Sequence, residues 1–358
     1  MKILITGNLG YVGPGLVQEF RKAYPHSTLI GYDIGYFSKN LTTPFLSPDA
    51  FLDIQYFGDV RNFPEEYLKG VDTVVHLAAI SNDPIGNRFE EVTLDINYKA
   101  TLDIAEKAKR QGVRSFVFAS SCSVYGFAES DARTETSSVN PLTAYAKSKV
   151  LSEEGLSKIA DDHFKVTCLR FATACGISER LRLDLVLNDF VAGAITAGEI
   201  TILSDGTPWR PLINVKDMAR AIRWAHERSV SEGGEFLVVN TGSDEWNYQV
   251  KELALAIKET LPEIKVSINK DAQPDKRSYR VDFSLFRSLA PDFQPIYDLQ
   301  TTIDQLIEGL QGINFSNKNF RNSDLIRLFV INDLKAKNFI DAELRIVQPK
   351  EVVKELVG

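Results

Sequence analysis

The sequence is poor in the residues that build disulfide scaffolds and metal centres. It has only three cysteines and four histidines in 358 residues. Cys122, Cys168 and Cys175 are odd in number and lack metal-type pairing, so we expect three reduced thiols in a cytoplasmic protein. The histidines show no H-x-x-x-H spacing, which argues against a zinc site.

Long apolar runs and an excess of basic charge are also missing. No apolar run is long enough to span a bilayer, and an apolar strand with a glycine loop begins at once where a signal peptide would stand. The formal net charge of −7 disfavours general binding to nucleic acid or to an anionic membrane. With 44% hydrophobic residues the chain can bury a large core. We therefore expect a cytoplasmic globular protein with no membrane and no nucleic-acid partner.

Three glycines directly after the first apolar strand form the most informative pattern that is present. Gly7, Gly10 and Gly13 have the spacing G-x-x-G-x-x-G between a strand and a helix. In such a turn, backbone N–H groups can approach a pyrophosphate at a helix N-terminus, where the helix dipole favours negative charge. Asp33 stands twenty positions after Gly13, at the end of a second apolar run. An acid there can bond the adenosine ribose and repel the 2′-phosphate of NADP, so the pattern predicts NAD binding.

Strands and helices alternate through the first half of the chain. This alternation predicts an α/β fold, a Rossmann-type doubly wound parallel sheet with a smaller α+β substrate-binding lobe. The expected strands are 2–6, 28–32, 54–57, 72–77, 115–120, 165–170 and 235–240. The expected helices are 13–23, 89–110, 143–160, 183–198, 215–228, 247–260, 299–312 and 322–336.

The pattern changes after about residue 171, and this change suggests the domain limits. We expect residues 1–170 and about 210–243 to form the NAD-binding domain. The substrate-binding lobe takes residues 171–209 and 244–313. Residues 314–358 are expected to be a C-terminal appendage, a lid or an oligomer contact.

A second constellation predicts oxidation of a hydroxyl group. Tyr145 and Lys149 are four residues apart, so they share one face of a helix. A free tyrosine ionises near about pH 10, but a neighbouring ammonium and the positive nicotinamide ring of NAD would lower its pKa. Tyr145 would then take a proton from a substrate hydroxyl as hydride leaves the same carbon for NAD. Ser121, at the carboxyl edge of its strand, can bond the reacting oxygen.

Several motifs along the first 310 residues point to one family. They are Thr6 with the three glycines, Asp33, Asp59-Val60, His76-Leu77-Ala78-Ala79, Asn97, Ser120-Ser121 with Val124-Tyr125-Gly126, Tyr145 with Lys149, and Trp209-Arg210-Pro211. On these motifs the chain resembles the extended short-chain dehydrogenase/reductases, in particular the NAD-dependent nucleotide-sugar epimerases and dehydratases. Residues 171–186 and 274–280 are also similar to a branch that acts on GDP-linked heptoses.

The resemblance implies NAD as cofactor and a set of residues that contact it. Asp59 and Val60 would contact adenine, Leu77 to Ala79 would line the cofactor's path, and Asn97 would stabilise the sheet and a proton-relay water. The full set is Gly7, Leu9, Gly10, Tyr11, Val12, Gly13, Asp33, Asp59, Val60, Leu77, Ala78, Ala79, Asn97, Ala119, Tyr145 and Lys149.

The resemblance also implies a nucleotide-diphosphate sugar as substrate. The residues implied to contact it are Ser121, Ser123, Thr173, Asn188, Arg210 and Arg277. Asn188, Arg210 and Arg277 are candidates to hold the diphosphate, since arginine donates paired hydrogen bonds to phosphate oxygens. Arg180 and Arg182 either face the substrate cleft or belong to a charged loop, and we favour the loop. A homodimer through the helices 89–110 and 143–160 is also implied.

One departure from the family pattern bears on the reaction. The 4,6-dehydratases carry an Asp-Glu pair after the catalytic Ser or Thr, whereas this chain has Cys122 and Ser123 there. Water elimination is therefore disfavoured, and oxidation of the sugar 4-hydroxyl to a 4-keto intermediate remains. The intermediate is reduced from its other face in a 4-epimerase, which we favour, or released in a 4-dehydrogenase. A non-catalytic NAD-binding protein is disfavoured because it needs neither Tyr145 nor Lys149.

Overall fold

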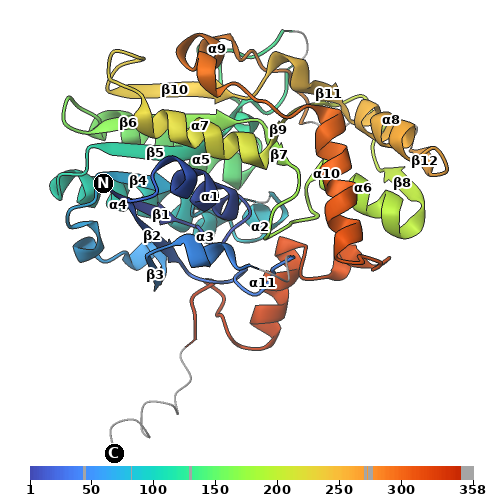
Figure 1. The fold of residues 1–358 in the computed structure, drawn as a ribbon, viewed down its shortest axis with the longest axis horizontal. Helices are drawn as coiled ribbons and strands as arrows, with labels where there is room; N and C mark the ends of the chain where they lie inside the picture. Colours follow the sequence, from blue (N-terminus) through green and yellow to red (C-terminus); the bar gives the residue numbers. More distant parts are fainter. Residues whose placement is uncertain (43–45, 82, 129–130, 270–271, 273–276, 348–358) are drawn as a thin grey trace, which may run out of the picture.

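Seven parallel strands form the central sheet of the protein (Figure 1). The computed structural model describes residues 1–42, 46–81, 83–128, 131–269, 272 and 277–347. The strands lie in the order β10-β6-β5-β4-β1-β2-β3. Their bounds are β1 (Lys2–Thr6), β2 (Thr28–Asp33), β3 (Ile54–Phe57), β4 (Thr73–His76), β5 (Ser115–Ser121), β6 (Lys165–Phe171) and β10 (Phe236–Thr241). The predicted fold class is confirmed, and the strand order reverses between β1 and β4, where such sheets bind ligands.

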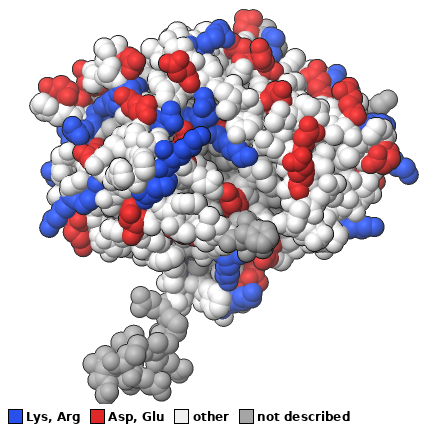
Figure 2. Space-filling view, in the orientation of Figure 1, with Lys and Arg blue, Asp and Glu red and all other residues white. Residues whose placement is uncertain are grey.

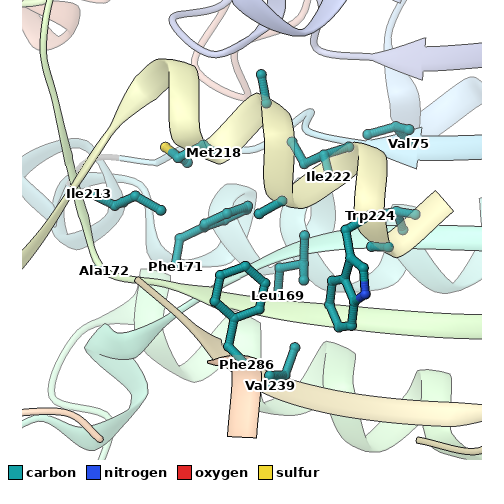
Figure 3. Close-up of a cluster of buried hydrophobic side chains, with 14 of the residues drawn as sticks. Val75, Leu169, Phe171, Ala172, Ile213, Met218, Ile222, Trp224, Val239 and Phe286 are labelled. Atoms are coloured by element: carbon teal, nitrogen blue, oxygen red, sulfur yellow. The ribbon is translucent and has the colours of Figure 1, made fainter. Parts of the chain in front are cut away.

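Helices cover both faces of this sheet because successive strand residues point to opposite faces. On one face, Ile3 and Ile5 pack with α1 (Gly13–Ala23) and α7 (Val215–Glu227). On the other face, Leu4 packs with α4 (Ala100–Arg110) and α5 (Ala144–Ile159). Figure 3 shows the first core, in which α7 side chains meet strand side chains and Phe286 of α9 (Ser284–Leu289). The labelled α7 residues there are Met218, Ile222 and Trp224.

The long helix predicted over 89–110 consists of three pieces in the structure. These are α3 (Glu90–Leu94), a π-helical turn (Asp95–Lys99) and α4, and a separate helix, α2 (Asp83–Arg88), precedes them. Asn97 lies in the π-helical turn and bonds the backbone of Ile80 in both directions, at 2.8 and 3.0 Å. The wider turn therefore coincides with a side chain that ties the helix to the loop after β4.

The second part of the molecule has a hydrophobic core of its own. It contains α6 (Val186–Ala197), α8 (Val250–Thr260), α10 (Leu299–Gly312) and the parallel pair β8 (Glu199–Ile202) and β12 (Lys265–Ile268). A three-stranded sheet joins β7 (Thr173–Cys175), β9 (Trp209–Asn214) and β11 (Asn247–Gln249). These five short strands were not predicted. The predicted helix 247–260 begins only at Val250 because residues 247–249 pair with β9.

The C-terminal appendage packs on the first part of the molecule. Its helix α11 (Arg327–Ala336) begins later than the predicted 322–336 and lies beside α2 (Figure 1). A small core there buries Val330, Ile331, Leu334, Ile340 and Leu344. None of the helices in the described part of the chain is long and apolar enough to cross a bilayer. Figure 2 shows acidic and basic side chains interspersed on the face seen there.

Candidate active site

The glycine loop forms a cradle that has no room for side chains. Gly7 has a φ of +74°, and a Cβ on it would lie 2.5 Å from the backbone nitrogen of Ala78. A Cβ on Gly13, where α1 begins, would lie 1.9 Å from the carbonyl oxygen of Asn8. Both positions therefore require glycine. The loop brings backbone N–H groups to a helix N-terminus, which fits the pyrophosphate of a dinucleotide.

Asp33 is held in place at the carboxyl end of β2. Its carboxylate accepts hydrogen bonds from the backbone nitrogens of Leu9, at 3.1 Å, and Gly35, at 2.7 Å. Burial raises the pKa of Asp33, while these two bonds and the charges of Arg180 and Arg327 lower it. The carboxylate is thus anchored to the glycine loop, and its predicted bond to the adenosine ribose stays a prediction.

The residues expected at adenine lie one strand further along the sheet. Val60 is buried, and the carboxylate of Asp59 accepts hydrogen bonds from the fork of Arg61 at 2.5 to 3.0 Å. A cavity of about 290 Å³ lies beside them. It is lined by Ile34, Asp59, Asn62, Arg345 and Ile346.

Ser121, Tyr145 and Lys149 come together between the carboxyl end of β5 and the first two turns of α5. The Ser121 hydroxyl lies near the Tyr145 phenol and acts to lower its pKa. Lys149 donates a hydrogen bond of 2.6 Å to the carbonyl of Ala119, and its Nζ lies 5.5 Å from the centre of the Tyr145 ring. Thr143 caps α5 by accepting a hydrogen bond of 3.1 Å from Ala146, so the helix holds both side chains in register.

Burial controls the protonation of this group. It lowers the pKa of Lys149 to about 7, against the raising charge of Glu153. It raises the pKa of Tyr145 to about 12, although the Ser121 hydroxyl and the charge of Arg182 lower it. We predicted that Lys149 lowers the pKa of Tyr145. In the protein alone the pKa of Tyr145 is raised, because the effect of burial outweighs that of the nearby positive charges.

The loop after β4 continues the floor of the site. Leu77 donates a backbone hydrogen bond of 3.0 Å to Thr6, and Ala78 lies against Gly7. Ala78 and Ala79 are half-buried, as the path of a cofactor requires. The amide of Asn97, besides its bonds to Ile80, donates to Ser148 of α5 at 3.1 Å. The structure therefore gives Asn97 a role in joining the β4 loop to two helices.

Asn188 is fully buried, and its amide bonds groups inside the protein. Its oxygen accepts a hydrogen bond of 2.9 Å from Gly176, and its nitrogen donates to the Tyr11 hydroxyl and to the carbonyl of Arg182. Asn188 is thus bonded within the protein, and its contact with the substrate diphosphate stays a prediction. The residue joins the glycine loop to the segment 176–182, because Tyr11 also donates a hydrogen bond of 2.5 Å to Gly176.

Arg210 and Arg277 lie next to each other, as a shared anion site requires. Arg210 donates to the carbonyls of Trp209, at 2.9 Å, and of Arg277. The guanidinium of Arg277 forms an ion pair of 2.8 Å with Asp83, which begins α2. Sequence reasoning missed Asp83, whose charge raises the pKa of Tyr145. Asp83 stands six residues after Leu77, in the segment that follows β4, where the strand order reverses and such sheets bind ligands. This position could have indicated that Asp83 belongs to the site.

The other two residues implied in substrate binding lie beside the catalytic group. Ser123 donates a backbone hydrogen bond of 3.1 Å to the Ser121 hydroxyl. The Ser123 hydroxyl is buried and has no hydrogen-bond partner among the described residues. Thr173 begins β7, next to Phe171 at the end of β6, and is half-buried. The contacts of both hydroxyls with a substrate stay predictions.

Arg180 and Arg182 do not lie in an exposed charged loop. Their side chains are buried, with exposed fractions of 1% and 7%. Arg182 forms an ion pair of 2.8 Å with Asp184, and its charge acts on Tyr145. The two arginines do lie in the loop between β7 and α6, but they are buried, and the side chain of Arg327 from the C-terminal appendage bonds this segment at the carbonyl of Arg180.

The geometry of the site agrees with a comparison with known protein families. The sequence model of the NAD dependent epimerase/dehydratase family matches residues 3–242. The chain belongs to the NAD dependent epimerase/dehydratase family. Its cofactor is therefore NAD, and it is an NAD-dependent enzyme, which confirms the resemblance and the cofactor predicted from the sequence. Among the described residues, no group of three or more His, Cys, Asp or Glu side chains is arranged to hold a metal ion.

Individual relatives carry out different reactions on the same framework. The chain is 31% identical over 237 residues to an uncharacterized UDP-glucose epimerase, YtcB, of Bacillus subtilis, covering 62% of this chain and 71% of that protein. It is 25% identical over 292 residues to UDP-glucuronic acid decarboxylase 6 of Arabidopsis thaliana, covering 79% and 81%. A solved structure of the NDP-hexosamine 5,6-dehydratase TunA superposes with a TM-score of 0.74 at 24% identity, covering 87% and 98%, and shares the fold.

Proposed function

We propose that this protein is a nucleotide-sugar 4-epimerase that oxidises the sugar 4-hydroxyl through Ser121, Tyr145 and Lys149. The observation that carries this proposal is the placement of Ser121 and Tyr145 next to each other at the carboxyl edge of the sheet, with Lys149 held beside them by its hydrogen bond to Ala119. The arrangement supplies one group to orient a hydroxyl and one to accept its proton. A chain that only bound NAD would need neither.

Each residue of the group has a distinct part in the reaction. When bound, NAD supplies the hydride acceptor beside the substrate carbon. The Ser121 hydroxyl orients the sugar oxygen toward Tyr145, whose phenolic oxygen takes the proton. Lys149, with a pKa of about 7, can hold or release a proton at neutral pH. Arg182 stabilises negative charge on Tyr145 from inside the protein.

The substrate-side arginines support a nucleotide diphosphate as the anionic half of the substrate. Arg210 and Arg277 are joined by a hydrogen bond, and Arg277 reaches Asp83 at the entrance to α2. Planar guanidinium groups donate paired hydrogen bonds to diphosphate oxygens. The named relatives, a UDP-glucose epimerase and a UDP-glucuronic acid decarboxylase, add support for a nucleotide sugar.

The positions after Ser121 favour epimerisation over elimination. Cys122 is buried against the carbonyl of Arg170 at 3.0 Å, and burial raises its pKa far above neutral. Ser123 carries only a hydroxyl. Neither can act as the acid or base that removal of water from the sugar needs. Release of the 4-keto product, as in a 4-dehydrogenase, is the second candidate, because nothing in the Ser121 site distinguishes reduction from release.

Incubation with a panel of UDP-, GDP-, CDP- and dTDP-sugars, followed by NMR of the products, tests the proposal. We expect the 4-epimer of one sugar from the wild type, and a rate at least about 100-fold lower from Tyr145→Phe, because a positioned base contributes this much or more. Tyr24→Phe is the matched control, since Tyr24 bonds Glu227 on the surface. A dehydrated product, or equal rates in wild type and Tyr145→Phe, would contradict the proposal.

We also propose that two copies associate through α4 and α5. The family resemblance implies a dimer through these helices, which lie side by side in one chain with Leu102 close to Gly155. Light scattering at micromolar concentration should give twice the mass of one chain. A monomeric mass at that concentration would contradict this proposal.

A further inference from the structure

The C-terminal appendage lies on the end of the sheet where the adenosine half of NAD is expected. Tyr36, in the loop after β2, donates a hydrogen bond to the carbonyl of Leu344. Arg61 donates to the carbonyl of Glu343 at 2.7 Å while its other nitrogens hold Asp59. The same two segments that are expected to contact the adenosine therefore also bind the appendage. The appendage residues in these contacts lie outside residues 3–242, the range that the family model matches.

The cavity beside Asp59 is formed jointly by the sheet and the appendage. Ile34, Asp59 and Asn62 line it from the sheet, and Arg345 and Ile346 line it from the appendage. The guanidinium of Arg345 lies 3.9 Å from the carboxylate of Asp59. An apolar side chain and a planar cation thus face a space of about 290 Å³, and both kinds of group stack on flat aromatic rings.

A second observation concerns the buried donors of Arg327 and Arg180. Arg327 is 4% exposed; it stacks on Phe37, with 4.1 Å from the guanidinium to the ring centre, and donates to the carbonyl of Arg180. Its Nη1 has no hydrogen-bond partner among the described residues. Arg180 is 1% exposed and pairs with Asp49 at 2.7 Å, yet its Nε and Nη1 are also without partners there.

These unpartnered donors indicate an anionic ligand. A buried polar group without a hydrogen bond destabilises the folded protein, and a charged one does so more strongly, so folded proteins rarely leave several together. Burial lowers the pKa of Arg327 to about 9, with the nearby charge of Arg182 adding to the effect. Three carboxylates, Asp33, Asp49 and Asp184, lie near the three arginines, so it is the unpartnered donors, and not an excess of positive charge, that indicate an anionic ligand.

The cluster also lies beside the glycine loop. Ser178, two residues before Arg180, donates a hydrogen bond of 2.7 Å to the carbonyl of Tyr11. The charges of Arg180 and Arg327 act on Asp33, whose carboxylate is bonded to Leu9. The two arginines therefore lie near Asp33, and Arg180 is near a residue that is hydrogen-bonded to the glycine loop, where the pyrophosphate of a dinucleotide is expected.

We propose that the C-terminal appendage is part of the NAD site, with Arg327 and Arg180 binding the pyrophosphate of the cofactor and Arg345 and Ile346 covering its adenine. The inference rests on the NAD site of the proposed function and is independent of which sugar is the substrate. We call Arg327, Arg345 and Ile346 of the appendage the clasp, since they would lie over the bound cofactor. An appendage that excludes the dinucleotide is the competing outcome, and binding measurements distinguish the two.

Isothermal titration of nucleotide-free full-length protein with NAD and with ADP-ribose tests the clasp. Arg327→Gln should weaken both ligands at least tenfold, because a charge-assisted bond to phosphate is lost. The affinity for adenosine, measured by displacement of ADP-ribose, should stay within twofold. Lys337→Gln is the matched control, since Lys337 directly follows α11, is exposed and, among the described residues, pairs with Asp333 at 2.7 Å. Arg327→Lys should recover part of the affinity because it restores the charge.

Other results would overturn the inference. Unchanged or tighter NAD binding by Arg327→Gln would show that the appendage does not hold the cofactor or that it excludes it. An equal loss for adenosine would point to a general disturbance of the site. If Arg327→Gln does not fold, Arg345→Gln serves instead, because Arg345 is partly exposed, and it should weaken adenosine several-fold. The sugar assay tests the proposed function separately. A protein that is inactive in that assay but binds NAD as predicted here would contradict the proposed function and still support the inference about the appendage.

Discussion

Replacing Lys149 by methionine should make the nucleotide-free protein more stable while it destroys activity. Lys149 is 3% exposed, and its pKa is lowered to about 7 by burial. The difference from the ordinary value of 10.5, at about 1.4 kcal/mol for each pH unit, amounts to about 5 kcal/mol of unfavourable free energy below pH 7. Methionine removes this charge but leaves the Ala119 carbonyl without its donor, which costs about 1 to 3 kcal/mol.

The pH dependence separates this explanation from a simple change in packing. Between the folded pKa of about 7 and the unfolded value of 10.5, the unfolded chain binds more protons than the folded chain. The free energy of unfolding of the wild type must therefore rise with pH in that window. The advantage of Lys149→Met should thus be largest near pH 6 and fall by about 3 kcal/mol on going to pH 9.

Urea unfolding of both proteins at pH 6 and pH 9 measures this difference. The midpoint of Lys149→Met should exceed that of the wild type at pH 6, and the two should approach each other at pH 9. A difference that stays constant between these pH values would show that Lys149 keeps its charge in the folded chain. The role that we propose for Lys149, to hold or release a proton at neutral pH, would then be wrong.

Two further substitutions test other parts of the structure. Asp33→Ala should relax the preference for NAD over NADP, measured as the ratio of their dissociation constants, since the carboxylate that would repel the 2′-phosphate is lost; an unchanged ratio argues against the ribose contact. Glu153→Gln should cost about 3 to 5 kcal/mol in urea unfolding, because it breaks the buried pair with Arg170 at 2.7 Å, whereas Arg114→Ala, at an exposed pair, should cost under about 1 kcal/mol. Similar small losses for both would refute the distinction between buried and exposed pairs.

The central sheet and the catalytic group could be predicted because their signals are local. The strands of the central sheet alternate with helical patterns along the chain, and the glycine loop, Asp33 and the Tyr145–Lys149 spacing each fall within a few residues of a strand or helix end. The strands β7, β8, β9, β11 and β12 have only three to six residues, and their pairing depends on distant segments. Short runs of that kind do not differ from turns in the sequence alone.

The polar interior could not be predicted, for a related reason. Charged residues are expected at the surface, so Arg180 and Arg182 were interpreted as an exposed loop. Arg327 lies 147 positions after Arg180 in the sequence, and no local pattern shows that the two meet. Asn188 at the start of a helix was interpreted as a ligand-binding residue, although its amide bonds Tyr11 and Gly176 inside the protein. In both cases the contacts that decide the role are long-range.

A nucleotide sugar deuterated at carbon 4 tests the central claim most directly. If Tyr145 removes the proton from the 4-hydroxyl as carbon 4 is oxidised, deuteration should slow the wild-type reaction, and the label should leave carbon 4 in the intermediate. NMR should then find deuterium at carbon 4 of the epimer, or none at that carbon in a released ketone. Turnover at the undeuterated rate, with chemistry at another carbon and the label untouched, would contradict the account.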